Sequence, residues 1–403
     1  MEAVLALPVL GEPVYDHQRL HAALCRAIRA DTSVVASWAV GAVDCAAWDL
    51  HSQLAQVPVA DLLAATPQRR VSLYASWLSL DVTNGIPVAA VERVNRDGWQ
   101  FTKWGLRKNP ATDDRKAEAV RLAVAVRAME AALRQEAAFD AVFTWDPELA
   151  SLFLDELDPA SLRWLEDPLP QCDLNTYGAL AMNIPLALGE RLLVHADAAA
   201  ILRLKLQAFT LDVVACGGLT RAVDLVTAAQ TFGVPVYPHG RSFVPAVHLA
   251  AAYPNAITAV EYRLQWEPVR QRRYAQPWLP SHGVITVPKH PGLGATPRAA
   301  DARNHSAPVH HRDRRSRLER HVARAVRTTR RTRHLPDRPA PTPRRSPGTS
   351  ADLELRRRHR PAPARPIART FRRTVGRHPA PTARLAHPVD TRRPGDRSPR
   401  RAP

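Results

Sequence analysis

The chain has 403 residues, of which 45% are hydrophobic, enough to bury one large core or the cores of several domains. Its formal net charge of +18 is confined to the last quarter: residues 298–403 contain 30 Arg, no Lys and 8 acidic residues, whereas residues 1–297 carry a net charge of −4. The first three quarters thus have the composition of a mildly acidic globular protein, and no stretch approaches the roughly 20 apolar residues that would span a bilayer.

The cysteines and the first residues indicate the compartment. The four cysteines show neither a CxxC spacing nor the density of a secreted disulfide framework; they are Cys25, Cys45, Cys172 and Cys216. Residues 1–16 are partly apolar but lack the basic start of a secretory signal. We therefore expect a soluble protein of the reducing cytoplasm that does not enter a membrane.

Two hydrophobic patterns follow each other along the chain. Apolar residues recur at intervals of three and four over residues 17–64, which predicts helices. Short apolar runs then predict strands over 71–77, 100–105, 137–142, 162–168, 185–190, 209–215, 234–240 and 257–262. Helical patterns separate them over 88–98, 113–133, 147–157, 174–183, 195–206, 220–233 and 243–254.

The alternation of strands and helices predicts the fold class. Strands joined through helices, without hairpin signals, run parallel with right-handed crossovers. Eight such strands in roughly 190 residues fit a closed barrel better than an open, doubly wound sheet. The sequence therefore predicts an α/β protein whose residues 69–297 form a (β/α)7-8 TIM-like barrel. The glycines of CGGLT at 216–220 are too few for a phosphate-binding loop.

The last segment, residues 298–403, has no sustained helical or strand period. Its Arg, Pro, Ala and His cannot bury enough apolar surface to offset chain entropy, so we expect disorder. The absence of Lys beside 30 Arg suggests translation of GC-rich DNA out of its proper frame. A tail that binds nucleic acid non-specifically through its Arg residues is the functional alternative.

Three carboxylates close consecutive predicted strands: Asp140, Glu166 and Glu190. Because catalytic groups of a parallel barrel lie at the carboxyl ends of its strands, we expect these three to converge. Carboxylate oxygens suit a hard cation such as Mg²⁺. A single acidic residue at such a place is more often a helix cap or a solvated loop residue, and it is the repetition that favours a metal site.

A second pair of polar residues ends the next two strands. Asp212 closes FTLD, and His239 closes VPVYPH 27 residues later. Neighbouring strands would bring the carboxylate to the imidazole, fix its tautomer and raise its basicity. A lone His near a strand end is more often structural, but the matched Asp favours an acid-base role.

These segments resemble the enolase superfamily, mandelate racemase type. WLEDPLP is similar to the family's WxEEP segment, PLALGER to its GE segment and DAVFTWDPELA to its DxN segment, with Val142 in the place where the family often has Asn. The stretches after Asp212 and around His239 resemble its DxxxxGG and PHG motifs. The resemblance covers about residues 5–297 and ends in HGVITVPKHPGLG. It implies Mg²⁺ bound by Asp140, Glu166 and Glu190; Asp146, Glu148 and Asp167 lie nearby, but the spacing to Glu166 favours Asp140.

The resemblance implies two further site residues. Lys103 in FTKWG lies where the family has a Lys-x-Lys pair, whose second Lys is replaced here by Gly105. A desolvated Lys can act as a base, although an exposed cation at a strand end is an equal alternative. Glu261 matches a late Glu that binds the substrate carboxylate when protonated.

The resemblance also implies a function: removal of the proton next to a carboxylate through an enediolate, most simply in the dehydration of an acid sugar to a 2-keto-3-deoxy acid. Racemisation, epimerisation or cycloisomerisation are alternatives within the same chemistry, and an inactive truncated or frameshifted product is a third. We expect a small-molecule sugar acid as substrate and a homo-oligomer. Residues 1–68 would be the helical remnant of a capping domain whose sheet is not found ahead of Met1.

Overall fold

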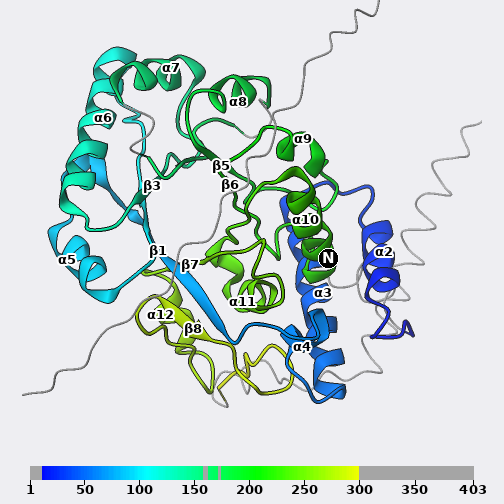
Figure 1. Ribbon diagram of the computed structural model, residues 1–403. Coiled ribbons are helices and arrows are strands. Elements are labelled where there is room, and N and C mark those ends of the chain that lie inside the picture. The colour runs from blue at the N-terminus through cyan, green and yellow to red at the C-terminus, as the bar shows by residue number, and fades with distance from the viewer. Residues whose placement is uncertain (1–10, 158–161, 171–173, 299–403) are drawn as a thin grey trace, which may run out of the picture. The chain divides into compact units, whose positions relative to one another are not determined.

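Three helices precede the strands in the computed structural model, which describes residues 11–157, 162–170 and 174–298. They are α2 (His17–Ala27), α3 (Val34–Leu54) and α4 (Val59–Leu63), as the helical pattern predicts. Asp16 caps the start of α2 and Ser33 that of α3, each by accepting a hydrogen bond from a backbone N–H three residues later. Helix α2 lies on the outer side of α3 (Figure 1), where Leu20 and Leu24 pack against its apolar residues.

Seven parallel strands follow, each within a predicted segment or overlapping it. They are β1 (Arg70–Asp81), β2 (Thr102–Gly105), β3 (Ala137–Asp140), β4 (Leu165–Glu166), β5 (Leu186–Leu188), β6 (Ala208–Phe209) and β7 (Val260–Arg263). Their order is β6-β5-β4-β3-β2-β1-β7. An eighth strand, β8 (Val284–Thr286), pairs antiparallel with β1. It lies in the segment HGVITVPKHPGLG, where the sequence resemblance ends.

The predicted strand over 234–240 closes the ring instead of forming a full ladder. Its Val236 bridges Phe209 on one side and Ile257 on the other, both in parallel. Backbone hydrogen bonds from His239 N to Leu211 O and from Glu261 N to Pro238 O continue the join. Because β7 also pairs with β1, the hydrogen-bonded ring is complete, and the predicted (β/α) barrel is confirmed.

Helices surround this ring (Figure 1). They are α5 (Val88–Asp97), α6 (Arg115–Ala132), α7 (Pro147–Glu156), α8 (Leu174–Leu180), α9 (Ala198–Leu202), α10 (Leu219–Phe232) and α11 (Phe243–Ala252). All seven lie in predicted helical segments or overlap them. A short helix, α12 (Glu267–Gln271), was not predicted, because five residues show no clear period.

One buried layer fills the lower part of the barrel. The layer contains four aromatic side chains and four alanines: Tyr74, Phe101, Trp164 and Tyr237, and Ala138, Ala187, Ala208 and Ala259. Tyr74 and Phe101 stack with ring centroids 4.4 Å apart, and the guanidinium of Arg163 lies 4.0 Å from the Phe101 centroid. Large and small side chains together fill the taper, so the barrel is closed at this level.

Helix α3 contacts the barrel through a glycine and an aspartate. Gly41 lies directly against the carbonyl of Val214. Asp44 accepts hydrogen bonds from the backbone N–H of Thr220 at 3.0 Å and from its hydroxyl at 2.6 Å, near the start of α10. The helical segment and the barrel accordingly belong to one compact unit, and the predicted boundary at residue 68 stays a prediction.

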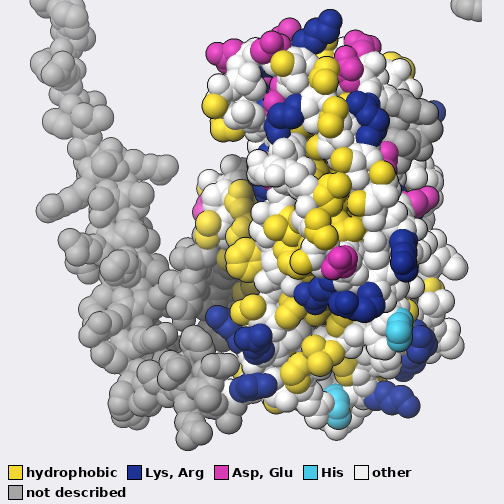
Figure 2. All heavy atoms as spheres, turned by 90° about the vertical axis from the view of Figure 1, so that its left-hand side faces the viewer, with side chains coloured by type: hydrophobic (Ala, Val, Ile, Leu, Met, Phe, Trp, Pro, Cys, Tyr) yellow, Lys and Arg dark blue, Asp and Glu magenta, His cyan; other side chains and the backbone are white. Residues whose placement is uncertain are grey.

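Apolar side chains gather on the face that carries α5 and α6, between charged ones (Figure 2). Val88, Val120 and Val124 are exposed there.

Cys25, Cys45 and Cys216 are free thiols, whereas Cys172 lies outside the described residues. None of the helices in the described ranges has the length and hydrophobicity of a membrane span. The predictions of a homo-oligomer and of a cytoplasmic location stay predictions, and those made for residues 299–403 lie outside the described part.

Replacing Gly41 by Ala is expected to destabilise the protein by about 1–3 kcal/mol, because the added Cβ would overlap the Val214 carbonyl oxygen. Thermal or urea unfolding measures the change. The control is Gly178→Ala in α8, where a Cβ would meet only Leu204 at 3.7 Å, so that the gain in helix propensity leaves stability equal or higher. Equal stability of the Gly41 variant and the unaltered chain would contradict the packing described.

The stability of the fold is expected to fall between pH 6.5 and about 4 through His248. Burial lowers its pKa to about 4. Its Nδ1 accepts from Ala60 N at 3.2 Å, so the neutral ring donates from Nε2 to Leu293 O at 3.1 Å. Below pH 6.5 His248 is protonated in the unfolded chain but stays neutral in the folded chain until the pH nears 4. The contribution of neutral His248 to stability is therefore fully present above pH 6.5 and is lost as the pH falls.

Urea unfolding as a function of pH measures this loss, which reaches the order of 3 kcal/mol at the acid end of the window. The His248→Gln variant lacks the titrating ring and is expected to show a shallower dependence over the same range. Parallel curves for the two proteins would contradict the assignment.

Candidate active site

A polar layer lies two residues beyond the aromatic and alanine layer on each strand. Because side chains of a strand alternate, residues two apart point into the barrel together. Ser76, Lys103, Asp140, Glu166, Gly189, Thr210, His239 and Glu261 form this layer. Glu190 and Asp212 follow just after β5 and β6. All seven predicted site residues therefore lie at the carboxyl ends of barrel strands.

The side chains of the polar layer surround a buried space, called the chamber below. Lys103 lies at its centre. Its Nζ lies 2.7 Å from Glu166 Oε1, 3.2 Å from Glu261 Oε1 and 3.5 Å from Asp140 Oδ2. Its side chain is fully buried, so the alternative of an exposed cation is wrong. Burial alone would lower the pKa of Lys103, but Glu166 and Glu261 raise it well above its usual range. The buried ammonium thus balances the surrounding carboxylates.

Glu166 and Asp140 each use both oxygens. Glu166 Oε2 accepts a hydrogen bond from Trp164 Nε1 at 3.0 Å, and its Oε1 contacts Lys103. Asp140 Oδ1 accepts from Val142 N at 2.8 Å. Burial raises the pKa of Glu166 to about 7 against the opposing charge of Lys103.

The predicted dyad is formed. His239 Nδ1 lies 2.9 Å from Asp212 Oδ2, and Asp212 Oδ1 accepts from Ser242 Oγ at 2.6 Å and from Ala215 N at 2.8 Å. Although burial would raise the pKa of Asp212, the hydrogen bond with His239 lowers it, so this carboxylate only accepts and Nδ1 carries the proton. The ring is therefore fixed with Nε2 toward the chamber.

His239 Nε2 joins the dyad to the carboxylates. It lies 3.0 Å from Glu190 Oε2 and 3.5 Å from Glu261 Oε2. Burial would lower the pKa of His239, but Glu261 and the hydrogen bonds to Asp212 and Glu190 raise it to about 10. Glu190 shows the reciprocal effect, because His239 lowers its pKa to about 2 against the effect of burial.

Glu261 lies between the two cationic side chains. Its Oε2 also accepts from Gly240 N at 2.7 Å. Burial would raise its pKa, but Lys103 and His239 hold it well below the usual range. These two neighbouring cations favour the ionised carboxylate, and the binding of a substrate carboxylate by protonated Glu261 stays a prediction.

One group of three neighbouring carboxylates includes Asp167, which the spacing of the sequence did not favour as a ligand. Glu166, Asp167 and Glu190 each offer an oxygen within 4.8 Å of the others, and Asp140 is not part of this group. The donors are all hard oxygens, and neither oxygen of buried Asp167 has a hydrogen-bond partner within residues 11–157, 162–170 and 174–298. The residues present therefore fit a small divalent cation.

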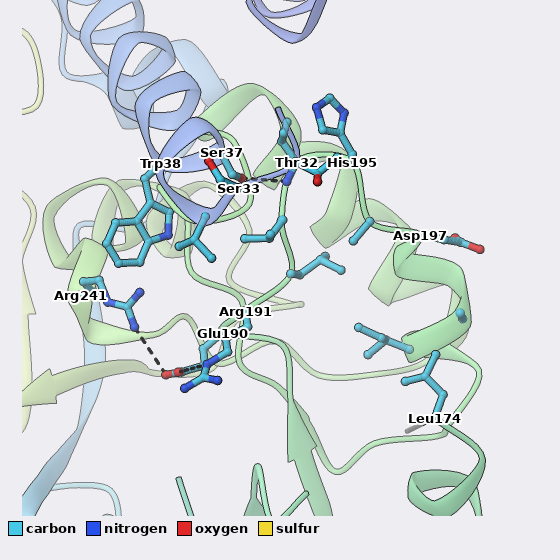
Figure 3. Close-up of a pocket in the computed structure, with 17 residues that line it drawn as sticks. Thr32, Ser33, Ser37, Trp38, Leu174, Glu190, Arg191, His195, Asp197 and Arg241 are labelled. Atoms are coloured by element: carbon cyan, nitrogen blue, oxygen red, sulfur yellow. Dashed lines mark hydrogen bonds and ion pairs between the residues drawn. The ribbon is translucent and has the colours of Figure 1, made fainter. Parts of the chain in front are cut away.

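A cavity of about 840 Å³ adjoins Glu190, between the start of α3 and the loop after β5. Figure 3 shows Arg241 pointing at Glu190, with the ring of Trp38 beside the guanidinium. Arg241 Nη2 lies 3.8 Å from Glu190 Oε2, and its guanidinium lies 5.0 Å from the Trp38 ring centroid. Sequence reasoning missed both residues; only the place of Arg241, two residues after His239, could have indicated it.

The chain is similar to several known proteins in sequence and in fold. D-xylonate dehydratase from Haloferax volcanii is 26% identical over 323 residues, covering 72% of this chain and 74% of the relative. L-talarate/galactarate dehydratase from Salmonella typhimurium is 28% identical over 255 residues, covering 61% of each. The crystal structure of L-talarate dehydratase from Polaromonas sp. JS666, complexed with Mg and L-glucarate, matches with a TM-score of 0.61 and 26% identity over 75% of this chain and 82% of that one.

The chain spans between 61% and 74% of the length of its curated relatives. A family model described as enolase C-terminal domain-like matches residues 87–302, which is more than half of the chain. The match covers β2 to β8 and with them every predicted site residue. The protein therefore belongs to the enolase C-terminal domain-like family.

Proposed function

We propose that the protein removes the proton next to the carboxylate of a sugar acid in a Mg²⁺-dependent reaction, and that the reaction is dehydration to a 2-keto-3-deoxy acid. The observation that carries the proposal is the placement of Lys103 and His239 at the two oxygens of Glu261, at 3.2 Å and 3.5 Å. Two groups that exchange protons thus face one buried chamber lined with carboxylates.

Glu166 and Glu190, together with Asp140, would hold the cation. When bound, Mg²⁺ supplies positive charge beside the substrate carboxylate while the neighbouring proton leaves. The hard oxygen donors and the partnerless oxygens of Asp167 support this part of the proposal. The relative from Polaromonas sp. JS666 was crystallised with Mg and L-glucarate.

His239 would donate a proton to the leaving hydroxyl. Its pKa, raised to about 10 by Glu261, Asp212 and Glu190 against the effect of burial, keeps the ring protonated at neutral pH. The contact from Nδ1 to Asp212 at 2.9 Å leaves Nε2 facing the chamber. The carbon–oxygen bond breaks, water leaves with the proton, and the resulting enol rearranges to the ketone.

Lys103 would accept the proton next to the carboxylate. For this its ammonium must first lose a proton, which requires the contact of Nζ with Glu166 Oε1 at 2.7 Å to be released. The other lysine of the family's pair is Gly105 here, so Lys103 is the basic side chain that β2 offers. Burial then favours the neutral amine.

The cavity beside Glu190 would receive the rest of the substrate. Arg241 lies at its wall, where a guanidinium can bind hydroxyl or carboxylate oxygens of a sugar acid. The names of the curated relatives, dehydratases of xylonate and of talarate or galactarate, support a sugar acid as the substrate class.

Racemisation or epimerisation is the second candidate. The observation in its favour is that two proton-exchanging groups, Lys103 on β2 and His239 between β6 and β7, both reach Glu261, and a two-base reaction needs two such groups. Incubation in deuterated water separates the two reactions, because a racemase returns labelled substrate without forming a keto acid.

The His239→Asn variant is expected to lose activity by a factor of about 10² to 10⁴, because the general acid is removed while the side chain stays polar. Formation of 2-keto acid from a panel of aldonic and aldaric acids, with Mg²⁺ and after chelation by EDTA, measures the effect. The matched control is His282→Asn, a surface histidine at a left-handed position (φ 49°) that Asn tolerates. Equal activity of the His239 variant and the unaltered chain would rule out the assigned role.

The Asp212→Asn variant is expected to move the alkaline limb of the pH–rate profile to lower pH. Asp212 helps to raise the pKa of His239, so its loss lowers that pKa and the protonated ring is lost at a lower pH. The profile of kcat between pH 6 and 11 measures the limb. A limb that stays in place, or moves to higher pH, would show that another group supplies the proton.

A further inference from the structure

Asp167 is a buried acidic residue whose side chain makes no hydrogen bond to the part of the chain that the structure describes. It directly follows Glu166, it is 1% exposed, and neither of its oxygens has a hydrogen-bond partner among the described residues. Removing a carboxylate from water is costly unless a charge or a donor compensates for it. The protein part of the site therefore leaves this side chain unsatisfied.

The backbone aims Asp167 into the chamber. Successive residues of a strand point to opposite faces, so Asp167 would be expected to point away from the barrel interior. Its φ of 43° breaks that alternation. Hydrogen bonds from Asp167 N to Ala187 O at 3.1 Å and from Phe143 N to Asp167 O at 2.7 Å fix the turn. An oxygen of Asp167 thereby comes within 4.8 Å of oxygens of Glu166 and Glu190.

The neighbouring carboxylates differ from Asp167 in how far they are engaged. Asp140 contacts Lys103 and Val142 N, and Glu166 contacts Lys103 and Trp164 Nε1. A cation that enters the chamber would displace a contact at each of these groups. At Asp167 it would displace no hydrogen bond.

We propose that Asp167 is an additional ligand of the divalent cation, beside Glu166 and Glu190, which lie closest to it, and beside Asp140. This inference rests on the proposed function, because the cation is the Mg²⁺ of that reaction. It explains why a strained, left-handed conformation and an uncompensated carboxylate occur side by side at the end of β4.

Titration calorimetry with MgCl₂ on the full chain, stripped with EDTA and without substrate, tests the inference. The Asp167→Asn variant is expected to bind Mg²⁺ at least about tenfold more weakly, because a neutral amide replaces the charged ligand. Its melting temperature without Mg²⁺ stays equal or rises, and the increase caused by Mg²⁺ is lost. The control is Glu267→Gln, which removes a buried carboxylate paired with Arg270 at 3.1 Å in α12 and leaves Mg²⁺ affinity unchanged.

Unchanged affinity together with a lower melting temperature in the Asp167 variant would assign the residue a purely structural role and overturn the inference, while the proposed function would stand. No binding by the unaltered chain would overturn the proposed function and this inference with it. Should the Asn variant fail to fold, Asp167→Ser, with a smaller neutral side chain, is expected to show the same loss of affinity, and full affinity there would refute the inference.

Discussion

The electrostatic balance around Lys103 is the constraint on which the site depends. A fully buried ammonium needs compensation, and the ends of three strands supply it through Glu166, Glu261 and Asp140. These carboxylates repel one another in the absence of a cation, and the lysine keeps them together. On the other side of the chamber, His239 compensates the charges of Glu190 and Glu261 in the same way. The positive charges of Lys103 and His239 thus allow several carboxylates to lie close together in the barrel.

The aromatic and alanine layer makes this arrangement possible. Residues two positions apart share the interior, so each polar group stands on a side chain of the layer below: Lys103 follows Phe101, Glu166 follows Trp164, and His239 follows Tyr237 in this way. A tightly filled lower layer keeps water from approaching the charges from that end. Helix α3 supports the other side, where Gly41 allows close contact with the loop after β6.

The sequence predicted the barrel and the dyad because both follow from period and strand order. The carboxyl ends of neighbouring strands have to meet, and so Asp212 reaches His239 across 27 residues. Asp167 was considered beside Glu166 and set aside for Asp140, because the sequence does not show the left-handed backbone that breaks the alternation of the strand there. Trp38 could not be found, since its contact with Arg241 joins segments about 200 residues apart and depends on how α3 packs. The state of Lys103 was undecided from sequence, because burial is a property of the closed ring.

The filled lower layer has a consequence for turnover. Tyr74, Phe101, Trp164 and Tyr237 fill one end of the barrel, and Arg163 lies over the Phe101 ring, so this layer closes the barrel below the charged residues. For the proposed chemistry, incoming sugar acid and outgoing keto acid therefore have to pass through the same opening, at the end of the barrel opposite this layer. Accumulated keto acid would therefore compete directly with substrate for this opening. The rate of product release then sets an upper limit on the turnover rate.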